Sequence, residues 1–302
     1  MDVNLGAVDL GSNSLRCLVV GYAKKRLTYR ASGLWITRIT EGIGSGSFVA
    51  EGRAVDRTMA AVREALKMLD AFGVEKSMTK VFATESLRAA GNGHSIKMMI
   101  EQLCALPVDI LSPSEEAYLS RKGALLGLGG HDVVFDLGGG SLELSGEDFA
   151  HSFPLGAVRM TGLYGEDWKK IKDAVKIALA GAKIHGKKLA GVGGTSSNLA
   201  MMAKGLPNSE YHPSKIHGCK ISLEYLALTR QRLESLSVDE RKNVLGLERG
   251  REDIIIAGIS VIEALLESLN LKEYTHSETD LLWAQCAAMA ESRGLEVEGI
   301  VL

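Results

Sequence analysis

Residues 9–15 read Asp-Leu-Gly-Ser-Asn-Ser-Leu, and residues 136–142 read Asp-Leu-Gly-Gly-Gly-Ser-Leu. Both stretches fit the pattern D-L-G-x-x-S-L, and the second begins a full domain length after the first. Solenoid repeats recur after roughly 20–50 residues, so this spacing is too long for a solenoid and suits two copies of one domain. The pattern therefore predicts an internally duplicated chain.

Short apolar segments flank each copy. Residues 5–8 and 133–135 precede the two glycine-containing stretches, and residues 17–20 and Leu144 follow them. Apolar runs bounded by glycine and serine are typical of strands joined by tight turns. Each copy is thus predicted to form a strand, a turn and a second strand.

Strands and helices alternate along the rest of the sequence. Apolar residues spaced by three and four predict a helix over residues 55–69, which Gly73 ends. Ser112 suits the N-cap of a later helix, because Pro113 follows it and Glu115 completes a capping box. Further expected elements are strands at 81–83, 108–111 and 189–192 and helices at 168–180, 253–269 and 280–290.

This alternation predicts an α/β fold, and a length of 302 residues suits two domains. The expected domains are residues 1–127 and 128–302, with the joint near residues 127–130. The last helix, within residues 280–302, is expected to be able to pack on the first domain.

Composition excludes several classes of protein. The net charge is −2, with 46% hydrophobic and 24% charged residues, so nothing global attracts the chain to nucleic acid or membrane. The four cysteines form no C-x-x-C pair, which argues against zinc and disulfides and favours a reducing cytoplasm. The start lacks a secretory signal, no apolar run reaches a membrane span, and the P-loop and dinucleotide fingerprints are absent.

The two duplicated turns have the chemistry of a phosphate site. Successive N–H groups in a glycine turn form an anion-binding nest, and an aspartate at the end of a strand can hold Mg²⁺. Asp9 and Asp136 are the candidate metal ligands, and Glu143 joins them because it shares a strand face with Ser141. The candidate phosphate-binding residues are Gly11, Ser12, Asn13, Ser14, Gly138, Gly139, Gly140 and Ser141.

One such turn alone would be read as an ordinary β-turn, but two copies facing each other would form a phosphate clamp. A third candidate phosphate element joins a strand to a helix at Gly193, Gly194 and Thr195. A helix N-terminus attracts anions, although a tight strand–helix connection without a ligand explains the same residues.

An ordered set of motifs resembles the exopolyphosphatase/guanosine pentaphosphate phosphohydrolase family over nearly the whole chain. The motifs are residues 7–14 (Ala-Val-Asp-Leu-Gly-Ser-Asn-Ser), 83–88 (Ala-Thr-Glu-Ser-Leu-Arg), 114–117 (Ser-Glu-Glu-Ala), 136–141 (Asp-Leu-Gly-Gly-Gly-Ser) and 193–195 (Gly-Gly-Thr), with further matches at 154–159, 251–253 and 257–258. The resemblance implies a duplicated actin-like (ribonuclease H-like) two-domain fold with an interdomain cleft. It also implies Mg²⁺-assisted hydrolysis of a terminal phosphoanhydride, with Mn²⁺ as a substitute metal.

The resemblance also assigns two catalytic residues. Glu116 matches the family's catalytic base, and its place in the first turn of a helix favours an ionised carboxylate. Arg88 matches an arginine whose planar fork suits the phosphoryl group in transfer. Without the resemblance, Glu116 would be interpreted as a surface side chain at the start of a helix, and Arg88 as part of a surface salt bridge.

Four departures from the family pattern bear on substrate preference and turnover. Pro113 stands in a position usually occupied by glycine, Leu142 replaces threonine, and Glu252 replaces alanine. Residues 276–280 (His-Ser-Glu-Thr-Asp) occupy the region of the family's Gly-Leu-Arg-Glu-Gly. Asp9, Glu116, Asp136 and Glu143 are retained.

The expected protein is a soluble cytoplasmic hydrolase that releases terminal phosphate from inorganic polyphosphate. The alternatives are a guanosine pentaphosphate (pppGpp) 5′-phosphohydrolase, a kinase of the same superfold, and a phosphate- or nucleotide-binding regulatory protein with weak turnover. The lysines of residues 169–188 would either guide a polyanion or form a solvated helix face. Nucleic-acid and membrane partners are not expected, and a homodimer is left open.

Overall fold

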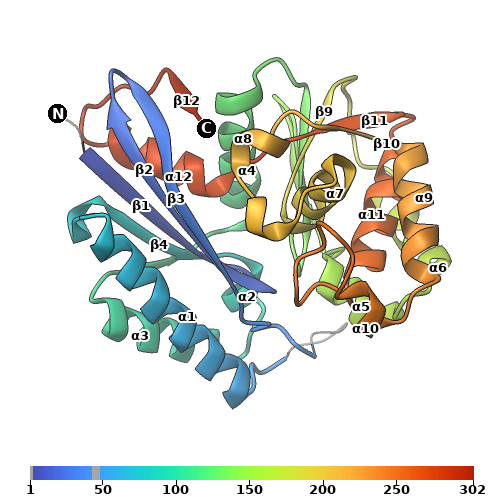
Figure 1. The fold of residues 1–302 in the computed structure, drawn as a ribbon, viewed down its shortest axis with the longest axis horizontal. Coiled ribbons are helices and arrows are strands. Elements are labelled where there is room, and N and C mark those ends of the chain that lie inside the picture. The colour runs from blue at the N-terminus through green and yellow to red at the C-terminus, as the bar shows by residue number, and fades with distance from the viewer. Residues whose placement is uncertain (1–2, 43–47) are drawn as a thin grey trace. The chain divides into compact units, whose positions relative to one another are not determined.

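The computed structural model describes residues 3–42 and 48–302, so Met1 and Asp2 of the N-terminal stretch lie outside the described residues. The chain divides into two compact units. Unit 1 comprises Met1–Gly127 together with Thr279–Leu302, and unit 2 comprises Leu128–Glu278. Each unit is built around its own six-stranded sheet, in keeping with the α/β class (Figure 1).

The sheet of unit 1 has the strand order β12-β3-β2-β1-β4-β5. Strands β1, β2 and β3 are antiparallel, whereas β4 and β5 run parallel to β1. The short strand β12 pairs in parallel with β3 and so brings the C-terminal end of the chain to this sheet. The bounds are β1 Val3–Leu10, β2 Ser14–Ala23, β3 Arg26–Ile36, β4 Thr79–Ala83, β5 Val108–Ile110 and β12 Gly299–Val301.

The sheet of unit 2 has the order β10-β11-β9-β6-β7-β8. Its strands β6, β7 and β8 are antiparallel, and β9 and β11 run parallel to β6. Each sheet has one added edge strand, β12 in unit 1 and β10 in unit 2. Without it, the order is β3-β2-β1-β4-β5 in unit 1 and β8-β7-β6-β9-β11 in unit 2, so the two sheets share one topology. The bounds are β6 Val133–Leu137, β7 Leu142–Ser145, β8 Ala150–Phe153, β9 Leu189–Val192, β10 Lys220–Ser222 and β11 Glu273–His276.

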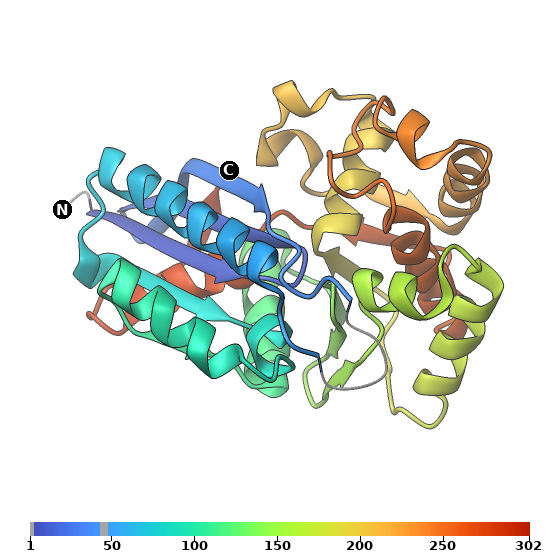
Figure 2. The same cartoon turned by 90° about the horizontal axis from the view of Figure 1, so that it is seen from below.

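Side chains that alternate along β1 select the helices on the two faces of the first sheet. Leu5 and Ala7 are buried in a cluster with apolar residues of helix α12 (Leu281–Glu291). Gly6 faces the opposite side, where a Cβ would lie 2.2 Å from the Leu69 side chain of α1 (Gly52–Ala71). Figures 1 and 2 show α1 and α3 (Gly93–Cys104) on one face and α12 on the other. The remaining helices of unit 1 are η1 Lys76–Met78, α2 Glu85–Arg88 and α4 Pro113–Leu128.

The core of unit 2 is formed around helix α11 (Ile255–Ser268), whose residues Ile255 to Leu266 are all buried. Phe135, Leu142 and Leu144 of the sheet are fully or almost fully buried in the same cluster. A helix that is apolar all round is expected only where neighbours cover every side. The helices that pack against α11 are α5 Ala157–Tyr164, α6 Trp168–Leu179, α7 Gly194–Lys204 and α9 Leu223–Glu234. The other helices of unit 2 are η2 Asn208–Glu210, α8 Pro213–Ile216 and α10 Val238–Arg241.

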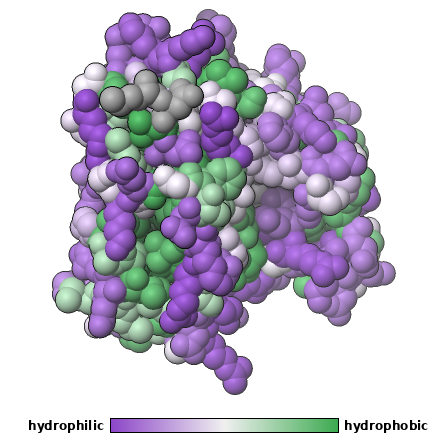
Figure 3. Space-filling view, turned by 60° about the vertical axis from the view of Figure 1, so that its left-hand side comes forward, coloured by the Kyte–Doolittle hydropathy of each residue, from purple (hydrophilic) through white to green (hydrophobic). Residues whose placement is uncertain are grey.

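The surface is mixed in polarity. On the face shown in Figure 3, green hydrophobic areas are interrupted by purple hydrophilic side chains. Across the described residues, no helix combines the length and the apolar character needed to cross a bilayer.

A close backbone contact fixes where the C-terminal segment meets α4. A Cβ on Gly123, in the middle of α4, would lie only 1.8 Å from the carbonyl oxygen of Asp280. Glycine inside a helix costs about 1 kcal/mol relative to alanine. Its presence is explained by this contact, since any side chain would push α4 and the start of α12 apart.

We expect Gly123→Ala to destabilise the protein by about 3 kcal/mol, because the methyl group would overlap backbone atoms that cannot rotate away. Thermal unfolding should record a melting temperature lower by about 6 °C. Gly52→Ala is the matched control, because a Cβ at Gly52 meets nothing within 4 Å. Equal melting temperatures for the two variants would contradict the contact between α4 and Asp280.

Candidate functional site

The first duplicated turn follows β1 in unit 1. The Gly11 N–H donates to the Ser14 carbonyl at 3.1 Å, and a Cβ on Gly11 would lie 2.8 Å from that oxygen. The carbonyls of the turn are also used, since Thr40 N–H binds Ser12 and Thr37 N–H binds Asn13. The predicted residues Ser12, Asn13 and Ser14 are therefore buried, at 4–7% exposure, in a turn with a fixed backbone.

Two polar groups beside this turn are buried without a hydrogen-bond partner among the described residues. One is the Asn13 side-chain amide, with its Oδ1 and Nδ2 atoms, and the other is the Oδ1 atom of Asp9. A buried polar atom without a partner costs about 1–3 kcal/mol, so such atoms in one place are characteristic of a ligand site. Burial raises the pKa of the Asp9 carboxyl, and the ion pair with Arg16 opposes that effect.

The second turn, in unit 2, repeats the geometry of the first. The Gly138 N–H donates to the Ser141 carbonyl at 3.1 Å, the same length as in the first turn. Arg159 then secures the turn, because its Nε donates to the Gly140 carbonyl at 2.9 Å and its N–H to Gly139 at 3.1 Å. Sequence reasoning noted residues 154–159 only as a family match and missed this support.

The third phosphate candidate lies against the second turn. Gly193 has φ +99°, and a Cβ there would lie 2.4 Å from the Leu137 carbonyl and 3.2 Å from Asp136 Oδ1. Gly194 begins α7, and a Cβ on it would lie 2.2 Å from the guanidinium of Arg251. Unit 2 thus brings Asp136, Gly193 and Gly194 together and adds Arg251, which sequence reasoning quoted without assigning it to the site.

The cross-strand register defines the acidic residues of the site. Glu143 is the register partner of Asp136, so both side chains project from one face of the β6–β7 pair. Glu143 is 1% exposed, and its Oε1 accepts a hydrogen bond from Ser152 at 2.7 Å. Asp9 occupies the matching position of unit 1, but its register partner is Arg16. Within residues 3–42 and 48–302, no cluster of three or more His, Cys, Asp and Glu side chains is arranged to hold a metal.

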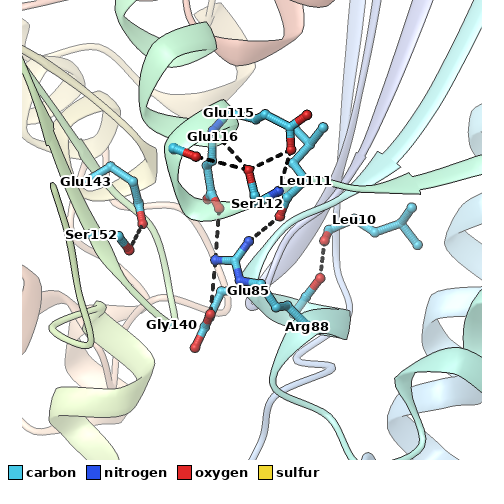
Figure 4. A network of polar contacts seen from close by, with 12 residues as sticks. Leu10, Glu85, Arg88, Leu111, Ser112, Glu115, Glu116, Gly140, Glu143 and Ser152 are labelled. Atoms are coloured by element: carbon cyan, nitrogen blue, oxygen red, sulfur yellow. Dashed lines mark hydrogen bonds and ion pairs between the residues drawn. The ribbon is translucent and has the colours of Figure 1, made fainter. Parts of the chain in front are cut away.

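Arg88 and Glu116, the two predicted catalytic residues, meet in unit 1. The Nη2 atom of Arg88 donates to Glu116 at 3.1 Å and to Glu85 at 3.0 Å, and its Nη1 binds the Leu111 carbonyl. Figure 4 shows the guanidinium directed between these groups. Glu116 is 6% exposed, and the hydrogen bond from Arg88 orients its carboxylate.

The start of α4 has the predicted capping box. The Ser112 N–H donates to Glu115 at 2.8 Å, and the Glu115 N–H donates to Ser112 Oγ at 3.3 Å. The Ser112 hydroxyl also donates to the Glu115 carboxylate at 2.6 Å, and this bond together with the one from the Ser112 N–H lowers the pKa of the Glu115 carboxyl. Glu115 is thus occupied with helix capping, whereas its neighbour Glu116 is oriented by Arg88.

A buried polar network supports the first turn of α7. Glu278 accepts hydrogen bonds from Ser197 Oγ at 2.8 Å and Tyr211 Oη at 2.6 Å, and His276 Nε2 lies 2.8 Å from it. His276 Nδ1 in turn lies 2.8 Å from Ser196 Oγ. This serine–histidine–carboxylate order also occurs in serine hydrolases, but Ser196 is fully buried and cannot meet a substrate. Its role is to hold α7 against β11.

The lysines of α6 are largely paired within unit 2. Lys172 and Lys176 both form ion pairs with Glu267, and Lys170 pairs with Asp167 at 3.2 Å. Lys169 lies over the Trp168 ring, 5.5 Å from its centroid. These contacts favour a solvated helix face over a continuous track for a polyanion.

Comparison with known proteins assigns the family. Residues 32–281 match the Ppx/GppA phosphatase family. The chain belongs to this family. It is therefore a hydrolase of the phosphatase type, and the predicted relationship is confirmed.

Individual relatives differ in length. The chain is 27% identical to exopolyphosphatase 2 of Mycobacterium tuberculosis, over 92% of this chain and 96% of that protein. It is 26% identical to a bifunctional 3-dehydroquinate synthase/phosphatase of Fusobacterium nucleatum, over 91% of this chain but only 45% of that protein. A crystal structure of an exopolyphosphatase from Cytophaga hutchinsonii superposes with a TM-score of 0.84 at 20% identity, covering 98% of this chain and 99% of the other. The predicted duplicated actin-like α/β fold is confirmed.

Acid should weaken the network around Glu278. Burial acts to raise the pKa of Glu278, but the hydrogen bonds from His276, Tyr211 and Ser197 prevail and hold the pKa below its ordinary value of 4.5. A lowered pKa contributes stability that is present above pH 4.5 and is lost as the pH falls through the folded-state value. We expect Glu278→Gln to lower the melting temperature by about 5 °C at pH 7, and this deficit to shrink below pH 4.5.

The control is Glu273→Gln, because Glu273 forms an exposed ion pair with Lys220. Its melting temperature should change by about 1 °C or less. A Glu278→Gln deficit that stays constant from neutral to acidic pH would contradict the linkage.

The paired lysines lead to an expectation about long polyanions. Replacing both Lys170 and Lys176 by alanine should leave the affinity for long-chain polyphosphate, used as a test polyanion, and the salt dependence of that affinity within about twofold of wild type, because both lysines already have carboxylate partners. Glu267→Gln is the opposite change, because it releases Lys176 and leaves Lys172 with Glu263 alone, and it should strengthen the salt dependence. A large loss of affinity in the double lysine variant would show that these lysines bind the polyanion.

Proposed function

We propose that this protein hydrolyses the terminal phosphoanhydride of inorganic polyphosphate with the help of Mg²⁺. The observation that carries the proposal is the buried Glu116 carboxylate, oriented by Arg88 at the start of α4, in a member of a phosphatase family. The name of a relative with matching length, exopolyphosphatase 2, supports polyphosphate as the substrate.

Glu116 is the proposed general base. Its carboxylate would accept a proton from a water molecule as the water oxygen attacks the terminal phosphorus. The bridging P–O bond breaks in the same displacement, which releases orthophosphate and a chain shorter by one phosphate. Arg88 holds the Glu116 carboxylate in place, and its fork would also neutralise charge on the transferred group.

The glycine turns are the proposed phosphate-binding elements. In unit 2, the turn at Gly193 and Gly194 lies at the N-terminus of α7, where backbone N–H groups and the helix dipole favour anions. The guanidinium of Arg251 against Gly194 adds a positive charge at the same place. The turn of Gly11–Ser14 in unit 1 contributes the unpartnered Asn13 amide.

The predicted metal ligands Asp9, Asp136 and Glu143 are of the residue type that suits a hard divalent cation. Asp9 Oδ1 is buried without a partner among the described residues, and Asp136 and Glu143 project from one face of unit 2. Carboxylate oxygens are the ligands that Mg²⁺ and Mn²⁺ prefer. Mg²⁺, when bound, would neutralise phosphate charge and favour departure of the shortened chain.

The cytoplasm is the proposed location. All four cysteines are free and buried, as expected for a protein kept in a reducing compartment.

We expect Glu116→Gln to lower Mg²⁺-dependent phosphate release by about 10²- to 10⁴-fold, because glutamine cannot accept the proton from water. Phosphate release should be measured from long-chain polyphosphate and, in parallel, from guanosine pentaphosphate. The matched control is Glu115→Gln, whose side-chain oxygen can keep the capping box and which should retain activity within about threefold.

The outcomes separate the alternatives. Full phosphate release by Glu116→Gln from both substrates would overturn the role of Glu116. Faster release from guanosine pentaphosphate than from polyphosphate would assign the nucleotide as substrate. Phosphate transfer that requires an added acceptor would indicate a kinase, and binding without release would indicate a regulatory protein.

A further inference from the structure

Arg16 lies between two carboxylates from opposite ends of the chain. Its Nε and Nη2 donate to Asp9 Oδ2 at 3.2 and 2.7 Å, and its Nη1 donates to Asp280 Oδ2. The side chains of Asp9 and Asp280 are 5% and 9% exposed. All three residues belong to unit 1, so the contact depends on the return of residues 279–302 to that unit.

The two units differ at this register position. In unit 2 the cross-strand partner of Asp136 is the carboxylate Glu143, whereas in unit 1 the partner of Asp9 is the cation Arg16. An arginine paired with Asp9 alone would give a neutral pair, which attracts Mg²⁺ weakly. Asp280 adds a second carboxylate to this arginine and restores a net charge of minus one to the group.

Asp280 is held in place by contacts that do not involve Arg16. Its Oδ1 caps helix α12 by accepting the Leu282 N–H at 3.0 Å. Its backbone carbonyl lies directly against Gly123 of α4. Turning the carboxylate away from Arg16 would therefore also cost the cap of α12.

The effect reaches Asp9. Both bonds from Arg16 to Asp9 go to Oδ2, and Oδ1 remains buried without a partner among the described residues. Because Asp280 binds Nη1, the guanidinium presents its Nε–Nη2 edge to Asp9, and both of these nitrogens donate to Oδ2.

We propose that Asp280 is a positioning residue that restrains Arg16 and thereby leaves Asp9 Oδ1 available, with net negative charge, for the divalent cation. This inference rests on the proposed Mg²⁺ dependence and adds to it a residue from the far end of the chain. Asp280 itself is not a ligand in this proposal, because its two oxygens are used by Arg16 and the Leu282 N–H.

The test is the Mg²⁺ concentration that gives half of the maximal thermal stabilisation, measured at constant ionic strength for wild type and Asp280→Asn. Asparagine keeps the oxygen that caps α12 but removes the charge and turns an N–H group toward Arg16, so the Mg²⁺ stabilisation of each variant is measured from its own melting temperature without Mg²⁺. The half-effect concentration should rise by about tenfold. In phosphate release, the Mg²⁺ activation constant should rise by the same factor, while the rate at saturating Mg²⁺ stays within about twofold.

Two variants control for charge and fold. Glu291→Gln removes a carboxylate from the same helix, where it pairs with Lys122, and should leave the half-effect concentration unchanged. Asp280→Ser also keeps a capping oxygen and replaces Asp280→Asn in the test if the latter does not fold.

An unchanged half-effect concentration in Asp280→Asn, with wild type stabilised by Mg²⁺, would overturn the role of Asp280 and leave the proposed function intact. A wild type that Mg²⁺ neither stabilises nor activates would overturn both proposals. If Mg²⁺ stabilises and activates the wild type, the half-effect concentration of Glu291→Gln becomes decisive. A rise in Glu291→Gln equal to that in Asp280→Asn would show a general charge effect and would also overturn the role of Asp280.

Discussion

The hydrogen bond from the first glycine of each turn to the serine three residues later sets the rest of the site. Gly11 and Ser14 form it in unit 1 and Gly138 and Ser141 in unit 2, each at 3.1 Å. A turn of fixed length fixes the register of the two strands it joins. Asp9 is thereby placed opposite Arg16, and Asp136 opposite Glu143. A slip of one residue would turn these side chains to the other face of their sheets.

In each unit, the strand that precedes the glycine turn, β1 or β6, also pairs with a parallel strand on its other edge. The segment that follows this parallel strand contributes further residues of the site. In unit 1 β4 pairs with β1, and Ser86, just beyond it, donates to the Leu10 carbonyl at the end of β1. In unit 2 β9 pairs with β6, and Gly193 approaches the Leu137 carbonyl at the end of β6. The backbone scheme is shared, but the side chains differ, so one unit presents the Glu116–Arg88 pair and the other a glycine-initiated helix with Arg251.

Features encoded by neighbouring residues could be predicted from the sequence. The duplicated strand–turn–strand units, the capping box at Ser112 and the helices α1, α6, α11 and α12 all follow from local spacing, and the structure contains each of them.

The sequence did not reveal contacts formed by distant segments. Arg88 reaches Glu116 only because β4 and β5 are neighbours in the sheet, and Arg16 reaches Asp280 across almost the entire chain. Lys172 and Lys176 of α6 likewise form ion pairs with Glu267 of α11, and no local sequence pattern indicates this contact. The predicted catalytic, phosphate-binding and metal-ligating roles remain predictions.

The departures from the family pattern now have physical explanations that bear on whether catalysis has been lost. Pro113 occupies the first position of α4. Proline has no N–H group, but an N–H at this position would have no acceptor within the helix. Leu142 is fully buried in the core of unit 2, and Glu252 accepts the Gly250 N–H at 2.8 Å. Glu278, within the replaced segment 276–280, supports the first turn of α7. Each change therefore serves packing, capping or support, and none removes Asp9, Glu116, Asp136 or Glu143. A purely regulatory protein needs no general base, and without Glu116 the Arg88 guanidinium would keep Glu85 and the Leu111 carbonyl as partners. The retention of Glu116 therefore favours a working hydrolase.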